Sequence, residues 1–147
     1  VREEGLPNVF LRHQRHAQAT REAVRAWGLE LLCQEPREFS GALTAVLLPP
    51  GYDEAEFRRV ALENFDLSLG AGLGKVAGKV FRIGHLGDFN DLMLCGTLCG
   101  VEMSLAKFGV PVRASGVVAA MSCLASARLE AEAAKASPKN VPAPAAI

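Results

Sequence analysis

The chain has 147 residues, of which half are hydrophobic and 22% are charged, a composition typical of a folded globular domain. Its 16 basic and 16 acidic residues balance, so no net field favours nucleic acid or an anionic membrane as a partner. No run of about 18 apolar residues could span a bilayer, and the first residues lack the features of a signal peptide. We therefore expect a cytoplasmic protein with no nucleic-acid or membrane partner.

The first predicted element is a helix over residues 6–27, which has helical spacing of its apolar side chains. Gly28 is a typical helix stop. Two strands are expected next, at 29–33 and 42–48, with a loop between them that contains a proline.

A second helix is expected to begin after Asp53, because Asp53 and Glu56 have the spacing of a capping box. The segment 67–69 then predicts a short third strand. A glycine-rich loop at 70–78 and a fourth strand at 80–84 follow.

Asn90 is expected to cap a long helix that ends near Phe108, with Gly109 as its stop. A final helix should begin near Ser115, and the composition after Ser137 predicts a disordered tail. This order of elements predicts an α+β fold, with a small, mainly antiparallel sheet and helices packed on one face.

Arg82 is the most informative candidate residue. Strand alternation puts Phe81 and Ile83 on the helix-covered face and Arg82 on the opposite face. A guanidinium in a buried strand needs an anionic partner. That partner is either a bound carboxylate, which the guanidinium fork matches, or an internal acid such as Asp66 or Asp88.

The segment around Arg82 resembles a known family. Gly78 to Gly87 reads Gly-Lys-Val-Phe-Arg-Ile-Gly-His-Leu-Gly and is followed by Asp88, Asn90 and Gly-Val-Glu-Met at 100–103. It resembles the last strand and following helix of class V aminotransferases. His85 after Arg-Ile-Gly makes it most similar to the serine–glyoxylate type, with the alanine–glyoxylate enzymes as near relatives. Family-like segments also occur at 13–16, 27–29, 43–46, 65–66 and 70–73.

The resemblance implies the C-terminal small domain of a homodimeric fold-type I transferase that uses pyridoxal phosphate (PLP). Arg82 would bind the α-carboxylate of the amino-acid or 2-oxo-acid substrate, and His85 would either contact substrate or cap the turn. Residues 1–28 would link to a missing large domain, 29–135 would form the C-terminal domain, and 136–147 would be the tail. The implied reaction transfers an amino group from serine, or a similar donor, to glyoxylate.

The residues that hold PLP are not expected in this chain. In the family the Schiff-base lysine lies on the large domain, and none of the lysines here stands in a similar segment: Lys75, Lys79, Lys107, Lys135 and Lys139. We therefore assign no catalytic, cofactor-binding or metal-binding residue. The isolated chain is expected to be inactive, and the absent initiator Met suggests a chain that begins mid-protein.

Other motifs carry weaker predictions. The glycines from Gly70 to Lys79 have the wrong spacing for a phosphate loop. His13 and His16 could share a metal, but an exposed basic turn is the simpler interpretation. The cysteines should be free and buried, and Gly96 and Gly100 predict close packing of their helix on the sheet.

Two alternatives remain open at this point. A stand-alone module could use Arg82 to bind small acids or could pair with another protein. A transaminase of the same class could use a different amino donor. If the domain exists alone, the surface that would meet the large domain should cause weak solubility or self-association.

Overall fold

The computed structural model describes the backbone of residues 3–136 and the side-chain surroundings of residues 3–127. Within these residues the elements follow the expected order, with a short 3-10 helix in each of the two longer loops. They are α1 (Leu6–Trp27), β1 (Glu30–Leu31), η1 (Pro36–Glu38), β2 (Leu43–Leu47), α2 (Glu54–Phe65), β3 (Gly70–Ala71), η2 (Gly74–Val76), β4 (Val80–Gly84), α3 (Asp91–Phe108) and α4 (Gly116–Ala136).

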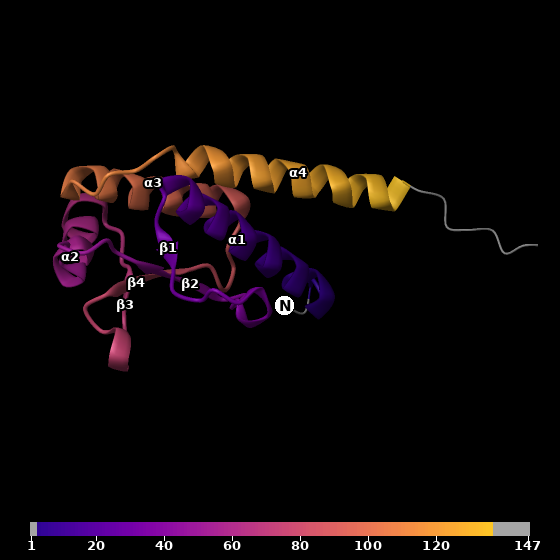
Figure 1. Cartoon of the computed structure of the whole chain (residues 1–147). Helices are drawn as coiled ribbons and strands as arrows, with labels where there is room; N and C mark the ends of the chain where they lie inside the picture. Colours follow the sequence, from indigo (N-terminus) through magenta and orange to yellow (C-terminus); the bar gives the residue numbers. More distant parts are fainter. Residues whose placement is uncertain (1–2, 137–147) are drawn as a thin grey trace, which may run out of the picture.

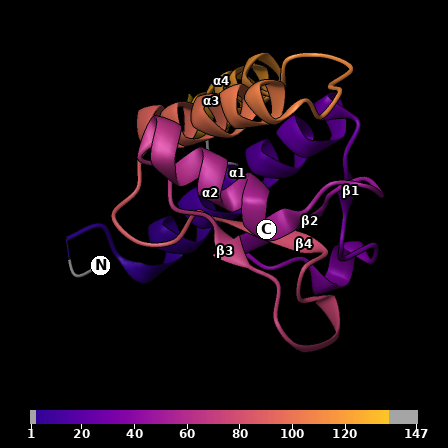
Figure 2. The ribbon, with the colours of Figure 1, turned by 90° about the vertical axis from the view of Figure 1, so that its left-hand side faces the viewer.

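The four strands form one antiparallel sheet in the order β1-β2-β4-β3. The helices lie together on one side of it, with α3 and α4 as the outer layer (Figures 1 and 2). The prediction of an α+β fold with helices on one face is confirmed. β4 is a central strand, so its side chains are positioned by neighbours on both sides.

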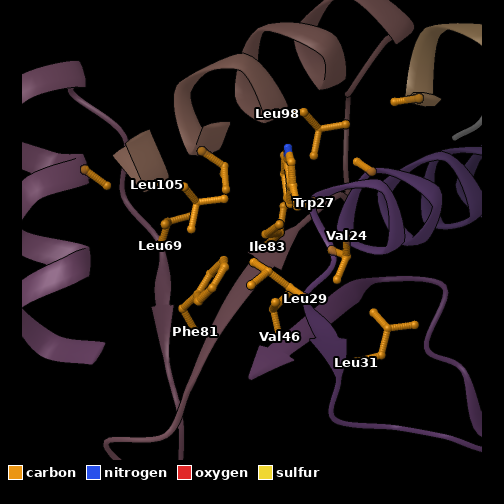
Figure 3. Packing of buried hydrophobic residues seen from close by; sticks show 14 of the residues in the cluster. Val24, Trp27, Leu29, Leu31, Val46, Leu69, Phe81, Ile83, Leu98 and Leu105 are labelled. Carbon is orange, nitrogen blue, oxygen red and sulfur yellow. The ribbon is translucent and has the colours of Figure 1, made fainter. Parts of the chain in front are cut away.

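The core lies between the sheet and the helices. From β4, Phe81 points towards Leu105 of α3, and Ile83 points towards Trp27 at the end of α1 (Figure 3). All four side chains are fully buried. Burial of a side chain of this size contributes about 1.5–3 kcal/mol, so this face of β4 is fixed by packing.

The helix ends confirm the capping residues that the sequence predicted. Gly28 and Gly109 both adopt the left-handed conformation after α1 and α3. The Asp53 side chain accepts a hydrogen bond from the Glu56 amide at the start of α2. Asn90 caps α3 by accepting from the Met93 amide at 2.9 Å.

The third strand is not where the sequence placed it. The prediction of a strand at 67–69 is wrong, because the Leu67 amide donates to the Ala61 carbonyl and so closes the end of α2. Asp66 turns the chain there, at a φ of 50°. Pairing with β4 begins only at Gly70, inside the segment that was expected to be a loop.

The helix at the start of the chain is part of the same core as the rest of the domain. Val24 and Trp27 of α1 belong to the buried cluster that also contains Ala120 and Leu124 of α4. A link from α1 to a large domain stays a prediction, as do the proposed domain boundaries. Of the predicted tail at 136–147, Ala136 is the last residue of α4 and the rest lies outside the described residues. None of the helices described here combines the length and apolarity needed to cross a bilayer.

Several side-chain predictions need correction. His13 and His16 are buried in α1 rather than exposed on a turn. None of the four cysteines forms a disulfide, as predicted, but Cys99 is exposed and the other three are only half-buried. Gly100 packs against Leu67, in the loop after α2 rather than on a strand, and a side chain at Gly96 would meet no atom within 4 Å.

The glycine-rich segment has a structural explanation. A side chain at Gly72 would place its first carbon 2.1 Å from the Val76 carbonyl oxygen. Gly72 is therefore required by the tight turn of its own loop. The segment continues through η2 into β4 rather than into a helix, which is not the geometry of a phosphate-binding loop.

Candidate functional site

The candidate site is the face of the sheet opposite the helices, at the middle of β4. Arg82 pairs with Ala45 of β2 on one side and with Gly70 of β3 on the other. Because these neighbours are small, the half-buried Arg82 side chain has room to lie along the sheet. Phe81 and Ile83 fix the strand from the opposite face.

The Arg82 guanidinium has no protein partner among the residues whose side chains are described. Its Nε is buried without a hydrogen-bond partner, and no ion pair joins Arg82 to Asp66 or Asp88. The internal salt bridge that the sequence left open is therefore not formed here. A charged guanidinium without an acidic partner is costly to keep half-buried, and a bound carboxylate would supply the missing negative charge.

His85 is the first residue after β4. It lies on the helix-covered side of the sheet, because it follows the core residue Ile83 by two positions. Its ring is fully buried, and Nε2 lies 3.0 Å from the Thr44 hydroxyl of β2. Burial lowers the pKa of His85 to about 4, so the imidazole is neutral at physiological pH. The structure thus separates Arg82 and His85. These contacts favour a role in holding the end of β4, and substrate contact stays a prediction.

The turn after β4 is held by two neighbouring residues of α1. Arg12 donates to the carbonyls of Gly87 and Phe89 at 3.0 and 2.8 Å. His13 Nε2 accepts from the Gly87 amide at 3.1 Å, while its Nδ1 lies 2.7 Å from the Val9 carbonyl. In these contacts Nε2 of His13 is the acceptor, and Nδ1 is placed to donate to the Val9 carbonyl. They position the segment that leads away from Arg82.

Sequence reasoning missed this arrangement because its partners are far apart in the chain. Arg12 and His13 lie more than 70 positions before Gly87 and Phe89. No local spacing relates the two segments. The family resemblance includes residues 13–16 but predicts no contact between them and this turn.

A groove of about 460 Å³ runs between α1 and the loops at 39–42 and 86, outside the Arg82 site. Apolar side chains line most of it, among them Phe10, Phe39 and Leu86. The Arg21 guanidinium lies 4.5 Å from the centre of the Phe39 ring, a cation–π contact. Burial lowers the pKa of Arg21.

The lysines whose side chains are described are all exposed. Lys75 and Lys79 are exposed in the loop between β3 and β4, and Lys107 is exposed in the last turn of α3. A lysine that forms a Schiff base needs an enclosed pocket that lowers its pKa. None of these three exposed lysines lies in such a pocket.

Comparisons with known proteins support the fold and the family that the sequence predicted. No protein-family profile matches the chain. Serine–glyoxylate aminotransferase of Arabidopsis thaliana is 54% identical over 123 residues, which are 83% of this chain and 31% of that protein. L-aspartate–glyoxylate aminotransferase of Paracoccus denitrificans is 48% identical over 118 residues, 80% of this chain and 30% of that protein. The crystal structure of pyridoxamine–pyruvate aminotransferase from Mesorhizobium loti superposes with a TM-score of 0.79 at 28% identity, over 84% of this chain and 32% of that chain.

The chain is a homologue of the C-terminal part of class V, serine–glyoxylate-type aminotransferases. It spans about a third of the length of the curated relatives that it matches. Its fold is that of the C-terminal domain of these aminotransferases. The predicted family and the predicted part of it are both confirmed.

Proposed function

We propose that this chain is the substrate-carboxylate-binding part of a PLP-dependent transaminase that moves an amino group from serine, or a similar donor, to glyoxylate. The observation that carries the proposal is the Arg82 side chain. It lies in the middle of a central strand, on the face without helices, and has no acidic partner among the described side chains. The serine–glyoxylate and aspartate–glyoxylate relatives support glyoxylate as the acceptor and leave the donor open.

Arg82 would bind the α-carboxylate that amino donors and oxo acids share. Two parallel N–H···O bonds from a guanidinium to a carboxylate fix both the position and the plane of the substrate. A substrate held in this way presents its α-carbon in one orientation, which favours reaction at that carbon. Arg82 therefore orients the substrate and takes no part in proton transfer.

PLP, when bound to the parent enzyme, supplies the electron sink for chemistry at the α-carbon. The exposed Lys75, Lys79 and Lys107 do not fit as its anchors. We place the cofactor site outside residues 3–127, in the large domain implied by the greater length of the relatives. The cytoplasmic location and the homodimer of the sequence-based prediction remain part of this proposal.

Substitution of Arg82 in the full-length protein tests the role of this residue. Arg82→Ala should lower kcat/KM for both the amino donor and glyoxylate by about 100-fold or more, because a charge-assisted bidentate contact is lost. Arg82→Lys keeps the charge but not the fork, so it should recover only part of the activity. Unchanged turnover in Arg82→Ala would refute the assignment.

A second experiment tests whether the 147-residue chain is inactive by itself. The purified chain is mixed with PLP and reduced with borohydride, and the lysines are mapped by mass spectrometry. Absence of a single modified lysine is expected. A saturable adduct at one lysine, or transaminase activity of the isolated chain, would mean that these residues hold cofactor chemistry of their own.

A further inference from the structure

Gly70 is the residue of the neighbouring strand β3 that lies directly beside Arg82. The first carbon of a side chain at position 70 would lie 3.1 Å from Arg82 Nε, 3.2 Å from its Cβ and 3.5 Å from its Cζ. The distances to Nε and Cβ are tighter than ordinary contacts of a side-chain carbon, whereas the distance to Cζ is an ordinary contact. The inner half of the guanidinium therefore rests on the Gly70 backbone.

Gly70 is not required here by an unusual backbone. It is absent from the glycines with positive φ, unlike Gly74 and Gly78 in the following loop. Alanine could therefore adopt its backbone conformation. The space beside Arg82 is what favours glycine at this position.

This contact decides which part of the guanidinium faces outward. Arg82 Nε is enclosed and lacks a partner, whereas the two terminal Nη atoms are not among the buried unpartnered atoms of the described side chains. Ala45 of β2 lies on the other side of Arg82 and also has a small side chain. A carboxylate that approaches the open face can therefore pair with the two Nη atoms, but not with the edge that contains Nε.

We propose that Gly70 is a positioning residue for Arg82. Because Gly70 has no side chain, the guanidinium can lie against the sheet and bind the substrate carboxylate end-on through its two Nη atoms. This inference rests on the proposed role of Arg82 as the carboxylate anchor. A methyl group at position 70 lifts the guanidinium by a few tenths of an ångström. The displaced fork then binds every α-carboxylate less well.

The expected kinetic pattern follows from the shared carboxylate. A displaced guanidinium weakens substrate binding in the ground state and in the transition state alike, so KM rises while kcat changes little. Both the amino donor and the oxo acid should show this rise, because both carry the group that Arg82 binds. General damage to the fold would instead lower the unfolding temperature and the amount of active protein.

The test uses the full-length enzyme with Gly70→Ala. KM for L-serine and for glyoxylate, and the inhibition constant of acetate as a carboxylate that cannot react, should each rise about tenfold. Gly41→Ala is the matched control, because a side chain there meets no atom within 4 Å and the backbone φ is not positive. It should leave all three constants and the unfolding temperature unchanged.

A double-substitution cycle separates this inference from the proposed function. If Gly70 acts through Arg82, Gly70→Ala should have no further effect on KM in an Arg82→Ala background. Equal and additive effects in both backgrounds would overturn the inference, as would constants for Gly70→Ala that match those of Gly41→Ala. A Gly70→Ala protein that loses its helical circular dichroism would also overturn it. If Arg82→Ala itself leaves KM and kcat unchanged, the proposed function fails instead.

Discussion

Glu102 and Arg82 are both half-buried charged side chains, but their surroundings are opposite. One oxygen of Glu102 accepts from the Trp27 indole at 2.8 Å, the Val117 amide at 3.1 Å and the Ser115 hydroxyl at 3.2 Å. Arg82 has no such partner among the described side chains, and its Nε is buried and unsatisfied.

The difference separates a charge that holds the fold from a charge that is available to a ligand. Glu102 is a residue of α3 and accepts hydrogen bonds from Trp27 at the end of α1 and from Val117 at the start of α4. Its negative charge therefore lies at the N-terminal, positive end of the α4 dipole. Removing it should cost stability. Removing Arg82 should cost binding and little stability, because no hydrogen bond or ion pair to the described side chains is lost.

The largest expected effect on stability comes from Gly116→Ala, which would disrupt the contact between the start of α4 and the end of α1. A side chain at Gly116 would place its first carbon 2.5 Å from the Trp27 ring and 2.7 Å from the Ala23 carbonyl oxygen. Such overpacking should lower the free energy of unfolding by about 3 kcal/mol, measured by urea denaturation of the full chain. Gly96→Ala is the control, and should be neutral or stabilising by up to about 1 kcal/mol. Equal effects of the two changes would contradict the packing account.

The next effect is the dependence of stability on pH that His85 imposes. Burial lowers its pKa from 6.5 to about 4 in the folded chain. Between these values the unfolded chain takes up a proton that the folded chain does not, so stability falls as the pH is lowered from 6.5 to 4. The loss should amount to roughly 2–3 kcal/mol.

His85→Gln should remove this part of the pH dependence, because glutamine does not titrate. Urea denaturation at several pH values between 4 and 6.5 measures the slope for both proteins. His85→Gln also retains an amide that can reach the Thr44 hydroxyl. A slope that is the same with and without His85 would mean that the ring is not buried as described.

A somewhat smaller effect is expected for Glu102→Gln. Burial acts to raise the pKa of Glu102, but hydrogen bonds from Trp27, Val117 and Ser115 together outweigh it and lower the pKa below 4.5. The resulting stability is present above pH 4.5 and is lost as the pH falls through the lowered pKa. At pH 7 the substitution should cost about 2 kcal/mol, and the chain should become less sensitive to acid below pH 4.5.

The smallest effect on stability is expected for Arg82→Leu. The substitution removes a buried unsatisfied nitrogen and no protein partner, so the free energy of unfolding should change by less than about 1 kcal/mol or should rise. The comparison with Glu102→Gln is made by urea denaturation at pH 7. A loss as large as that of Glu102→Gln would show that Arg82 stabilises the fold and would weaken its assignment as a ligand-binding charge.

Local patterns in the sequence predicted most of the fold. The caps at Asp53 and Asn90 and the stops at Gly28 and Gly109 depend on backbone groups a few residues away, so their spacing is visible in the chain. The third strand was misplaced because Leu67 could serve either a strand or the end of α2. Only the packed structure shows that its amide closes the helix.

The candidate site was predicted in part for the same reason. Alternation along β4 placed Arg82 on the face opposite Phe81 and Ile83, since side chains alternate in every strand. The same alternation places His85 on the covered face, yet its partner Thr44 lies 41 residues earlier and could not be inferred. The contact of Gly70 with Arg82 also depends on which strands pair.

By itself the sequence determined the order of the elements, the type of fold and the strand residue that faces away from the core. These features follow from hydrophobic periodicity and from local hydrogen bonds. The tertiary structure alone decided that Arg82 lacks an acidic partner among the described side chains, that Glu102 has three donors and that Gly70 supports the guanidinium. Each of these depends on distances between residues that are remote in the chain, and such distances are fixed only when the sheet and helices pack together.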